Sequence, residues 1–319
     1  MLLAGLACSL RPAGGAEVPD WWRAAWPRTD FSRLAVPVEE IMPGGPGKDG
    51  IPAIDRPKAV AVATVDDMAA TEPVISIEIA GDARAYPLRM LLWHEIANDT
   101  VGGTPVAITY CPLCNSAVAF DRRANGTVLD FGVSGMLRHS DMVMYDRQTE
   151  SWWQQYLGEA IAGALTGARL KSLPARVESL DRFRARHPGG LVVLPEDASR
   201  RPYGRNPYPG YDGEAWPFLY RGDYDGPIPP LARVVAVGDQ AWPLELLRRR
   251  GRIEHEDLVL TWAAGQNSAL DAASVAGGRD IGNVVVQRRS AEGLQDAVHD
   301  VSFAFAFRAF RPNGRLHLD

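Results

Sequence analysis

The sequence YPLRMLLWHEIANDTVGGTPVAITYCPLCNSAVAFDR, residues 86–122, contains the clearest secondary-structure signals of the chain. A proline at its start opens a short apolar helix that the pattern predicts over residues 87–95. The sequence VGGT at residues 101–104 is typical of a tight turn, and the apolar residues 106–110 after it predict a strand. A Cys-x-x-Cys pair follows, and a second strand is predicted over residues 117–121.

The flanking sequence also predicts short strands joined by turns. Residues 74–79 alternate between apolar and polar side chains, which is the period of a half-buried strand. Asn125 and Gly126 are the strongest short hairpin signal in the chain, and strands are predicted over residues 127–133 and 141–145. We therefore expect a mainly β fold, a β-rich α+β class. Alternating phenylalanines predict one more strand over residues 301–311.

The sequence indicates an internal duplication of a strand-hairpin-helix unit. The pattern of residues 81–88, GDARAYPL, returns as GDQAWPL at residues 238–244, again after an apolar strand. Further on, TYCPLCNSA at residues 109–117 aligns with TWAAGQNSA at residues 261–269. Two matches in the same order favour duplication over chance. The second unit lacks both cysteines and is therefore predicted to be degenerate.

These patterns predict five segments. They are a signal peptide or lipoprotein leader at residues 1–16, an extended N-terminal segment at 17–58, an active first repeat with the Cys-x-x-Cys pair at 59–195, a connector rich in Pro, Gly and Tyr at 196–230, and a degenerate second repeat at 231–319.

The leader predicts export to the periplasm or another extracytoplasmic space. Residues 1–10 are apolar and are followed by small residues that end in Gly14-x-Ala16, a pattern that signal peptidase cleaves. Cys8 offers a second interpretation, lipid attachment at a loose lipoprotein box. The later sequence has no apolar run of the roughly 18 residues that a membrane span needs.

Composition argues against nucleic acid as a partner. The formal net charge is −5, and the longest basic cluster is the run of three arginines at residues 248–250. No aromatic residues are interleaved with this cluster, so it is better explained as the solvated end of a helix.

The cysteine pair is the centre of any chemistry. With Cys8 removed or lipidated, Cys111 and Cys114 are the two cysteines that remain. A disulfide that closes a two-residue loop stabilises little, so the pair is better explained by reactivity or by metal binding. Thiol redox chemistry uses one thiolate to attack and the other to resolve a mixed disulfide, whereas metal binding uses both as soft ligands.

Histidine and glutamate side chains near the pair extend the candidate site. His94 and Glu95 are predicted to assist proton transfer to the two cysteines, which gives four candidate catalytic residues. In the metal alternative, His94 and His139 would join the two cysteines as ligands of copper or zinc. The residues predicted to line the pocket are Tyr110, Asn115, Ser134, His139, Asp146, Ser151, Trp153 and Gln154.

The two most distinctive stretches, residues 86–122 and FGVSGMLRHSDMVMYDRQTESWWQQ at residues 131–155, resemble the DUF3179 family. That family is a largely uncharacterised group of bacterial and archaeal proteins, and the resemblance extends over residues 55–310. Some of its members are selenoproteins, with selenocysteine in place of a motif cysteine. The resemblance therefore implies redox chemistry at the position of the pair.

Three hypotheses follow from the sequence. The first is an exported thiol oxidoreductase whose partner is a thiol/disulfide protein or a small-molecule substrate. The second is a metal-binding protein that holds copper or zinc. The third is a non-catalytic scaffold, in which the cysteines form a small structural clip.

Overall fold

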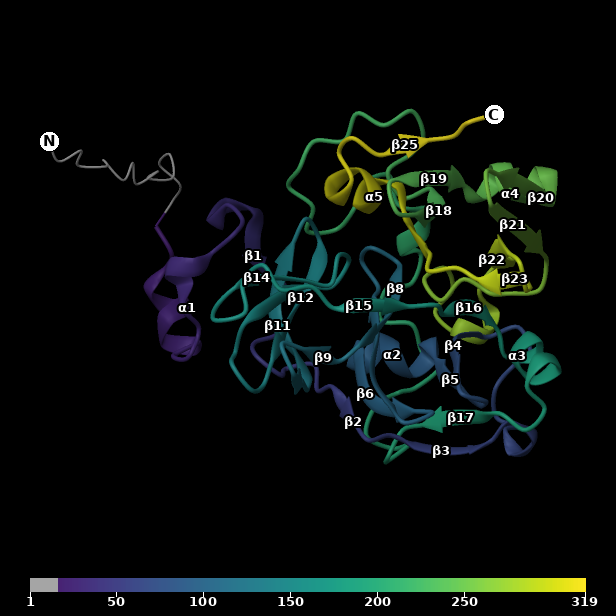
Figure 1. Cartoon of the computed structure of the whole chain (residues 1–319), viewed down its shortest axis with the longest axis horizontal. Coiled ribbons are helices and arrows are strands. Elements are labelled where there is room, and N and C mark those ends of the chain that lie inside the picture. The colour runs from purple at the N-terminus through teal and green to yellow at the C-terminus, as the bar shows by residue number, and fades with distance from the viewer. Residues whose placement is uncertain (1–16) are drawn as a thin grey trace, which may run out of the picture.

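The computed structural model describes residues 17–319, and the chain over this range is mainly β. Its strands form five sheets of four or five strands and one two-stranded hairpin. The five sheets lie in a ring, in the manner of a five-bladed propeller (Figure 1). The predicted β-rich class is confirmed. The leader predicted at residues 1–16, including Cys8, lies outside the described residues.

Two neighbouring sheets carry the residues of the candidate site. We call the first the cysteine sheet; its strand order is β15 (Lys171–Leu173), β8 (Ser116–Asp121), β7 (Thr104–Cys111), β6 (Ile96–Val101) and β2 (Ile54–Asp55). We call the second the aspartate sheet; its order is β1 (Ile41–Pro43), β11 (Phe131–Arg138), β12 (Asp141–Asp146), β13 (Trp152–Gln154) and β14 (Glu159–Ala162). Neighbouring strands are antiparallel in both, except that β2 runs parallel to β6.

Three further sheets complete the ring. One has the order β16 (Arg176–Ser179), β4 (Pro73–Ile79), β5 (Asp82–Pro87), β17 (Leu191–Leu194) and β3 (Lys58–Ala61). The next has the order β24 (Asp300–Phe303), β18 (Arg233–Val237), β19 (Gln240–Pro243) and β25 (Arg315–Leu316). The last has the order β20 (Arg252–His255), β21 (Leu258–Ala263), β22 (Asn283–Ser290) and β23 (Gly293–Asp296). The separate hairpin pairs β9 (Arg123–Ala124) with β10 (Thr127–Val128) around the predicted Asn125-Gly126 turn.

The α-helices within residues 17–319 are short; α1 precedes the first strand, and the other four each follow a strand. They are α1 (Asp20–Ala25), α2 (Leu88–His94), α3 (Leu180–Arg186), α4 (Leu244–Arg250) and α5 (Ala304–Phe310). Each has six or seven residues. No helix within residues 17–319 is therefore long enough to cross a membrane. The run of arginines at residues 248–250 forms the exposed last turn of α4.

The two halves share an order of elements. A hairpin, a helix and a second hairpin occur as β4-β5-α2-β6-β7 and again as β18-β19-α4-β20-β21. In each half, the second strand of the first hairpin also has a parallel neighbour: β17 pairs with β5, and β25 pairs with β19. The alignment of residues 109–117 with residues 261–269 does not extend to the second strand, because β8 begins at Ser116 whereas β22 begins only at Asn283. Duplication itself stays a prediction.

The predicted strand over residues 301–311 is wrong for most of its length. Strand β24 ends at Phe303, and residues 304–310 form α5. Phe303, Phe305 and Phe307 are all buried, and so are Ala304 and Ala306 between them, so the alternation did not mark one buried face of a strand. The alanines between them have high helix propensity, and Pro312 follows the helix end.

The N-terminal segment predicted to be extended contains α1 and docks on the aspartate sheet. Trp22 and Trp26 are buried, and their ring centroids lie 5.0 and 5.4 Å from the ring of Trp152. Lys48 lies over the ring of Trp26, 4.3 Å from its centroid. The segment is therefore part of the folded body.

Trp26→Ala should lower the free energy of unfolding by about 3–5 kcal/mol, because it removes a large buried ring and leaves a cavity. The matched control is Trp21→Ala, whose side chain is 49% exposed and should cost less than about 1 kcal/mol. Chemical denaturation of both variants checks this. Equal effects would contradict the docking of the segment.

Candidate functional site

The cysteine pair lies at the turn of a β-hairpin. Strand β7 ends at Cys111, which pairs with Ser116 at the start of β8. The N–H of Asn115 donates to the carbonyl of Pro112 at 3.2 Å, and Asn115 has a φ of 51°. No helix begins at this turn, so no helix dipole lowers the thiol pKa values, as it does in redox motifs of the thioredoxin type.

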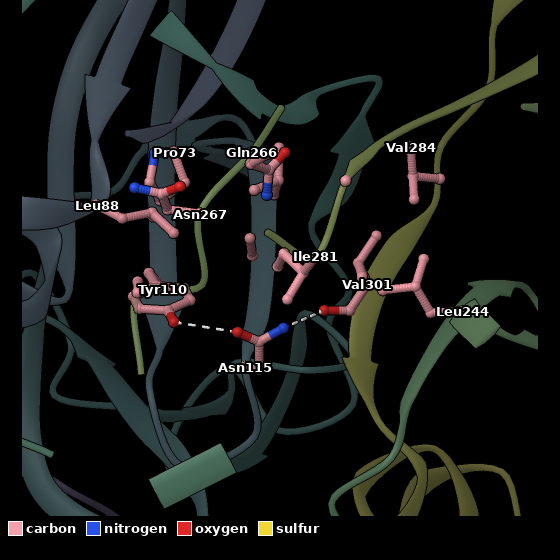
Figure 2. A pocket seen from close by; sticks show the side chains of 14 residues that line it. Pro73, Leu88, Tyr110, Asn115, Leu244, Gln266, Asn267, Ile281, Val284 and Val301 are labelled. Atoms are coloured by element: carbon pink, nitrogen blue, oxygen red, sulfur yellow. Dashed lines mark hydrogen bonds between the residues drawn. The ribbon is translucent and has the colours of Figure 1, made fainter. Parts of the chain in front are cut away.

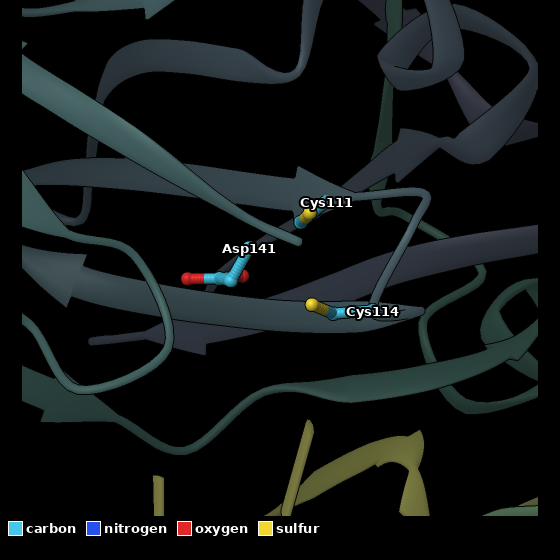
Figure 3. A group of neighbouring side chains, drawn as sticks. All are labelled: Cys111, Cys114 and Asp141. Atoms are coloured by element: carbon cyan, nitrogen blue, oxygen red, sulfur yellow. The ribbon is translucent and has the colours of Figure 1, made fainter. Parts of the chain in front are cut away.

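A second hairpin brings Asp141 to the two thiols. His139 and Ser140 have φ values of 52° and 64°, the two positive angles of a type I′ turn, and β12 begins directly after them at Asp141. The thiol of Cys111 donates to the carbonyl of Ser140 at 3.7 Å. The ligand atoms of Cys111, Cys114 and Asp141 all lie within 4.8 Å of one another (Figure 3). Both sulfur atoms point to the side of the hairpin on which the carboxylate lies.

The carboxylate of Asp141 is held by one of its two oxygens. The side-chain amide of Gln154 and the main-chain N–H of Tyr156, the latter at 3.0 Å, both donate to Oδ2. Oδ1 is buried and has no N–H or O–H partner among residues 17–319. This arrangement orients the carboxylate and leaves one oxygen free beside the thiols, as second-shell hydrogen bonds do at metal sites.

The three residues of the cluster and the neighbouring Glu95 are buried, and the pKa values of all four acidic groups are raised. Burial raises the pKa of Asp141 to about 7, although hydrogen bonds from Tyr156, Gln154 and the thiols oppose the effect. Burial also raises the pKa values of both cysteine thiols, that of Cys114 well above its ordinary value. Glu95 is the fourth acidic group, and burial together with the charge of Asp141 raises its pKa to about 8. None of the largest effects on these four groups comes from a lysine, arginine or histidine.

Glu95 has a backbone conformation that normally requires glycine. It follows the end of α2 with φ 59° and ψ −31°, and the residue at the same place after α4 is Gly251, with φ 70° and ψ −34°. Such angles cost a side chain with a Cβ of order 1–3 kcal/mol. The main chain is nevertheless held here, because the carbonyl of Glu95 accepts from the N–H of Tyr110 at 2.8 Å. A strained, buried acid beside the thiol of Cys111 points to a functional role.

Glu95→Gly should be more stable than Glu95→Ala by about 1 kcal/mol, since both remove the carboxyl group and only glycine relieves the backbone strain. Urea unfolding of the two variants measures the difference. As a control for the backbone angle, Gly251→Ala should destabilise the protein by a similar amount. An alanine variant as stable as the glycine variant would show that position 95 carries no strain.

A small cavity opens beside the cluster. Cys111 and Glu95 line it together with apolar side chains such as Val133, Met142 and Leu113, and its volume is about 60 Å³. That is room for a few water molecules. Cys114 is fully buried and is not part of the lining.

The connector and the second half of the chain enclose the hairpin from other sides. The hydroxyl of Tyr211 donates to the carbonyl of Leu113 at 2.8 Å, and Ser140 Oγ donates to the carbonyl of Phe218 at 2.6 Å. The N–H of Phe303 donates to the carbonyl of Cys114 at 2.9 Å. The connector therefore covers the cysteine turn as an ordered strap.

Tyr110 and Asn115 belong to a different, smaller pocket behind the hairpin. The Tyr110 hydroxyl donates to Asn115 Oδ1 at 3.2 Å, and Asn115 Nδ2 donates to the carbonyl of Val301 at 2.7 Å (Figure 2). Asn267 lines the same pocket from the second half of the chain. These contacts fasten the cysteine hairpin to β24 rather than forming part of the acidic cluster.

The two predicted histidines do not belong to the group formed by Cys111, Cys114 and Asp141. His94 Nδ1 donates to the carbonyl of Pro52 at 2.7 Å, so its Nε2 accepts from the hydroxyl of Tyr203 at 2.6 Å. Both ring nitrogens of His94 are thus occupied. His139 Nε2 lies 3.1 Å from Glu40. Its ring packs against Phe310, with 5.6 Å between the ring centroids.

The other predicted pocket residues have mostly structural contacts. Ser134 lies in a bulge of β11 and donates to the carbonyl of Val143. Asp146 closes a turn by accepting from the main-chain N–H of Thr149, and it also accepts from the indole N–H of Trp153 at 2.9 Å. The hydroxyl of Thr149 lies 2.8 Å from Ser151 Oγ. Gln154 is the predicted pocket residue that contacts the cluster, through Asp141.

Asp141 was missed by the sequence analysis. The segment SGMLRHSD ends at this residue, and the predicted strand over residues 141–145 begins there. A charged side chain that opens a buried strand directly after a tight turn is the signal that was available. Its proximity to the cysteines depends on the pairing of two sheets, and no local pattern records that pairing.

A family model for proteins of unknown function, DUF3179, matches residues 48–314. The chain belongs to the DUF3179 family. No curated protein and no solved structure matches it. The acidic cluster of this DUF3179 protein lies within the matched range, as does the connector that covers it.

Proposed function

We propose that this DUF3179 protein binds one zinc ion through Cys111, Cys114 and Asp141. The observation that carries the proposal is the group of three donor atoms within 4.8 Å, in a buried site whose pKa values show no compensating cation. Zinc would stabilise the thiolates and the carboxylate that burial otherwise keeps protonated. Oxygen and thiolate donors together suit Zn²⁺, whereas Cu⁺ prefers soft ligands alone. The carboxylate therefore favours zinc over copper.

Cobalt(II) titration of the reduced protein tests this proposal. Two cysteine thiolates bound to cobalt give sulfur-to-metal charge-transfer absorption in the near ultraviolet, and this band should saturate at one cobalt per chain. Added zinc should displace the cobalt and remove the band. Absorption that does not saturate, or that persists in a Cys111→Ser, Cys114→Ser double variant, would contradict the proposal.

Thiol redox chemistry is the second candidate, and one observation favours it. Cys111 lines the cavity, whereas Cys114 lies behind it, which is the order expected of an attacking and a resolving thiol. Oxidation of the pair to a disulfide would release two protons and two electrons to a disulfide-bearing partner or small molecule. The raised thiol pKa values disfavour it, because the thiolate is the reactive form. A scaffold without either chemistry is the third candidate.

We also propose export to an extracytoplasmic space, supported by the apolar leader at residues 1–16. In this proposal the second half of the chain, derived by duplication, is a scaffold without cysteines. Its support is the shared order of elements and the packing of β24 on the cysteine hairpin.

A further inference from the structure

We infer that the proposed zinc ion keeps a fourth coordination position open to the cavity, where it binds water or another small ligand through a single donor atom. This inference rests on the proposed function and deepens it. Zinc is nearly always four-coordinate, and sites with three protein ligands and one exchangeable position are typical of catalysis, whereas closed sites are structural. Within residues 17–319, Cys111, Cys114 and Asp141 are the donors that meet.

The obvious fourth protein ligand is Glu95, and its position argues against that role. Its carboxylate is not part of the group whose ligand atoms lie within 4.8 Å of one another. It lines the cavity instead, as Cys111 does. The main chain of Glu95 is held at this place by the hydrogen bond from the N–H of Tyr110 to its carbonyl, at 2.8 Å.

The carboxyl group of Glu95 has no hydrogen-bond partner that the described chain supplies. The residue is only 8% exposed, and within residues 17–319 no N–H or O–H group donates to its side chain. A buried polar group without a partner is costly unless a ligand or water satisfies it. A water molecule on the metal would lie in the cavity that Glu95 lines and would donate to this carboxylate.

The cavity also limits what can replace that water. Apart from the sulfur and the carboxyl group, the wall is formed largely by apolar side chains such as Ile51, Val133, Met136 and Met142. A volume of about 60 Å³ admits a ligand of a few atoms. The ligand class is therefore a small molecule or anion that coordinates through one atom, and the reaction class that such a site serves is the addition of metal-bound water to a small electrophile.

Azide added to the cobalt-loaded protein tests the inference. Wild-type protein should change its visible d–d absorption on azide binding, with the near-ultraviolet thiolate band retained. Glu95→Gln should lower the cobalt affinity by less than about 100-fold, the range expected when a hydrogen-bond partner of the bound water is changed, and should still respond to azide. Glu95→Asp serves as the matched control, because it keeps the charge and shortens the side chain.

Two results would overturn the inference while the zinc proposal stands. One is a cobalt spectrum that azide leaves unchanged, and the other is a loss of more than about 100-fold in cobalt affinity in Glu95→Gln, which would make Glu95 the fourth ligand of a closed site. Failure of the wild-type protein to take up cobalt at all would overturn both the inference and the proposed function.

Discussion

Zinc affinity should fall by more than about 100-fold when Asp141 is replaced by asparagine, because the variant removes a charged ligand, whereas loss of outer partners costs 10–100-fold. The amide has nearly the same size and can still meet Tyr156, so the hairpin should keep its shape. The effect should be as large for Cys114→Ser. Competition with a chromophoric zinc chelator measures the zinc affinities of wild type, Asp141→Asn and Cys114→Ser.

His94→Gln is the decisive control for this prediction, because His94 was the third ligand expected from the sequence. In the structure both of its ring nitrogens bond elsewhere, to Pro52 and Tyr203. The variant should bind zinc with wild-type affinity. An affinity that falls for His94→Gln and not for Asp141→Asn would restore the ligand set predicted from the sequence and refute the cluster.

The metal-free protein should lose stability as the pH rises from 5 to 8. The pKa values of Asp141 and Glu95 are raised to about 7 and about 8, so the folded state holds these protons more tightly than the unfolded chain does. Their contribution is therefore complete below pH 4 and is lost as the pH rises through the folded-state values. Each unit of pKa shift is worth about 1.4 kcal/mol, which makes the expected loss several kcal/mol.

Urea unfolding in the presence of a chelator measures this loss, and an Asp141→Asn, Glu95→Gln double variant isolates it. Asp300, which is buried outside the cluster, has its pKa raised to about 6. It is present in wild type and in the double variant, so it affects the pH dependence of unfolding equally in both. The double variant should show a flatter pH profile than wild type. Zinc should reverse the trend in wild type, because its ligands bind metal better when deprotonated. Identical pH profiles for wild type and the double variant would mean that burial raises the pKa of neither Asp141 nor Glu95.

Much of the local fold was predictable because it is recorded in local patterns. The period-two alternation of residues 74–79, the Asn125-Gly126 turn and the proline before α2 each correspond to the element expected there. The hairpin at the cysteine pair was also visible, since apolar strands flank it on both sides. These features depend on residues that are close together in the chain, so they can be predicted from the sequence alone.

The errors arose where contacts are distant along the chain. Asp141 meets the cysteines only because two sheets pack together, and the connector that covers the turn reaches it from about 100 residues away, as Tyr211 does for Leu113. His94 was predicted as a site residue because it precedes the cysteine strand in sequence, but its two ring nitrogens bond to Pro52 and to Tyr203, and Tyr203 is 109 residues away along the chain. The C-terminal phenylalanines gave a wrong prediction for a related reason, because residues 304–307 at the start of α5 are all buried and therefore show no helical period.

The most direct test of the zinc site is the metal content and the free-thiol count of a single preparation, purified anaerobically and without chelator. We expect about one zinc per chain and two thiols that react with a thiol reagent only after a chelator removes the metal. A metal-free protein whose two thiols react at once, or cycle reversibly to a disulfide, would contradict the proposed zinc site.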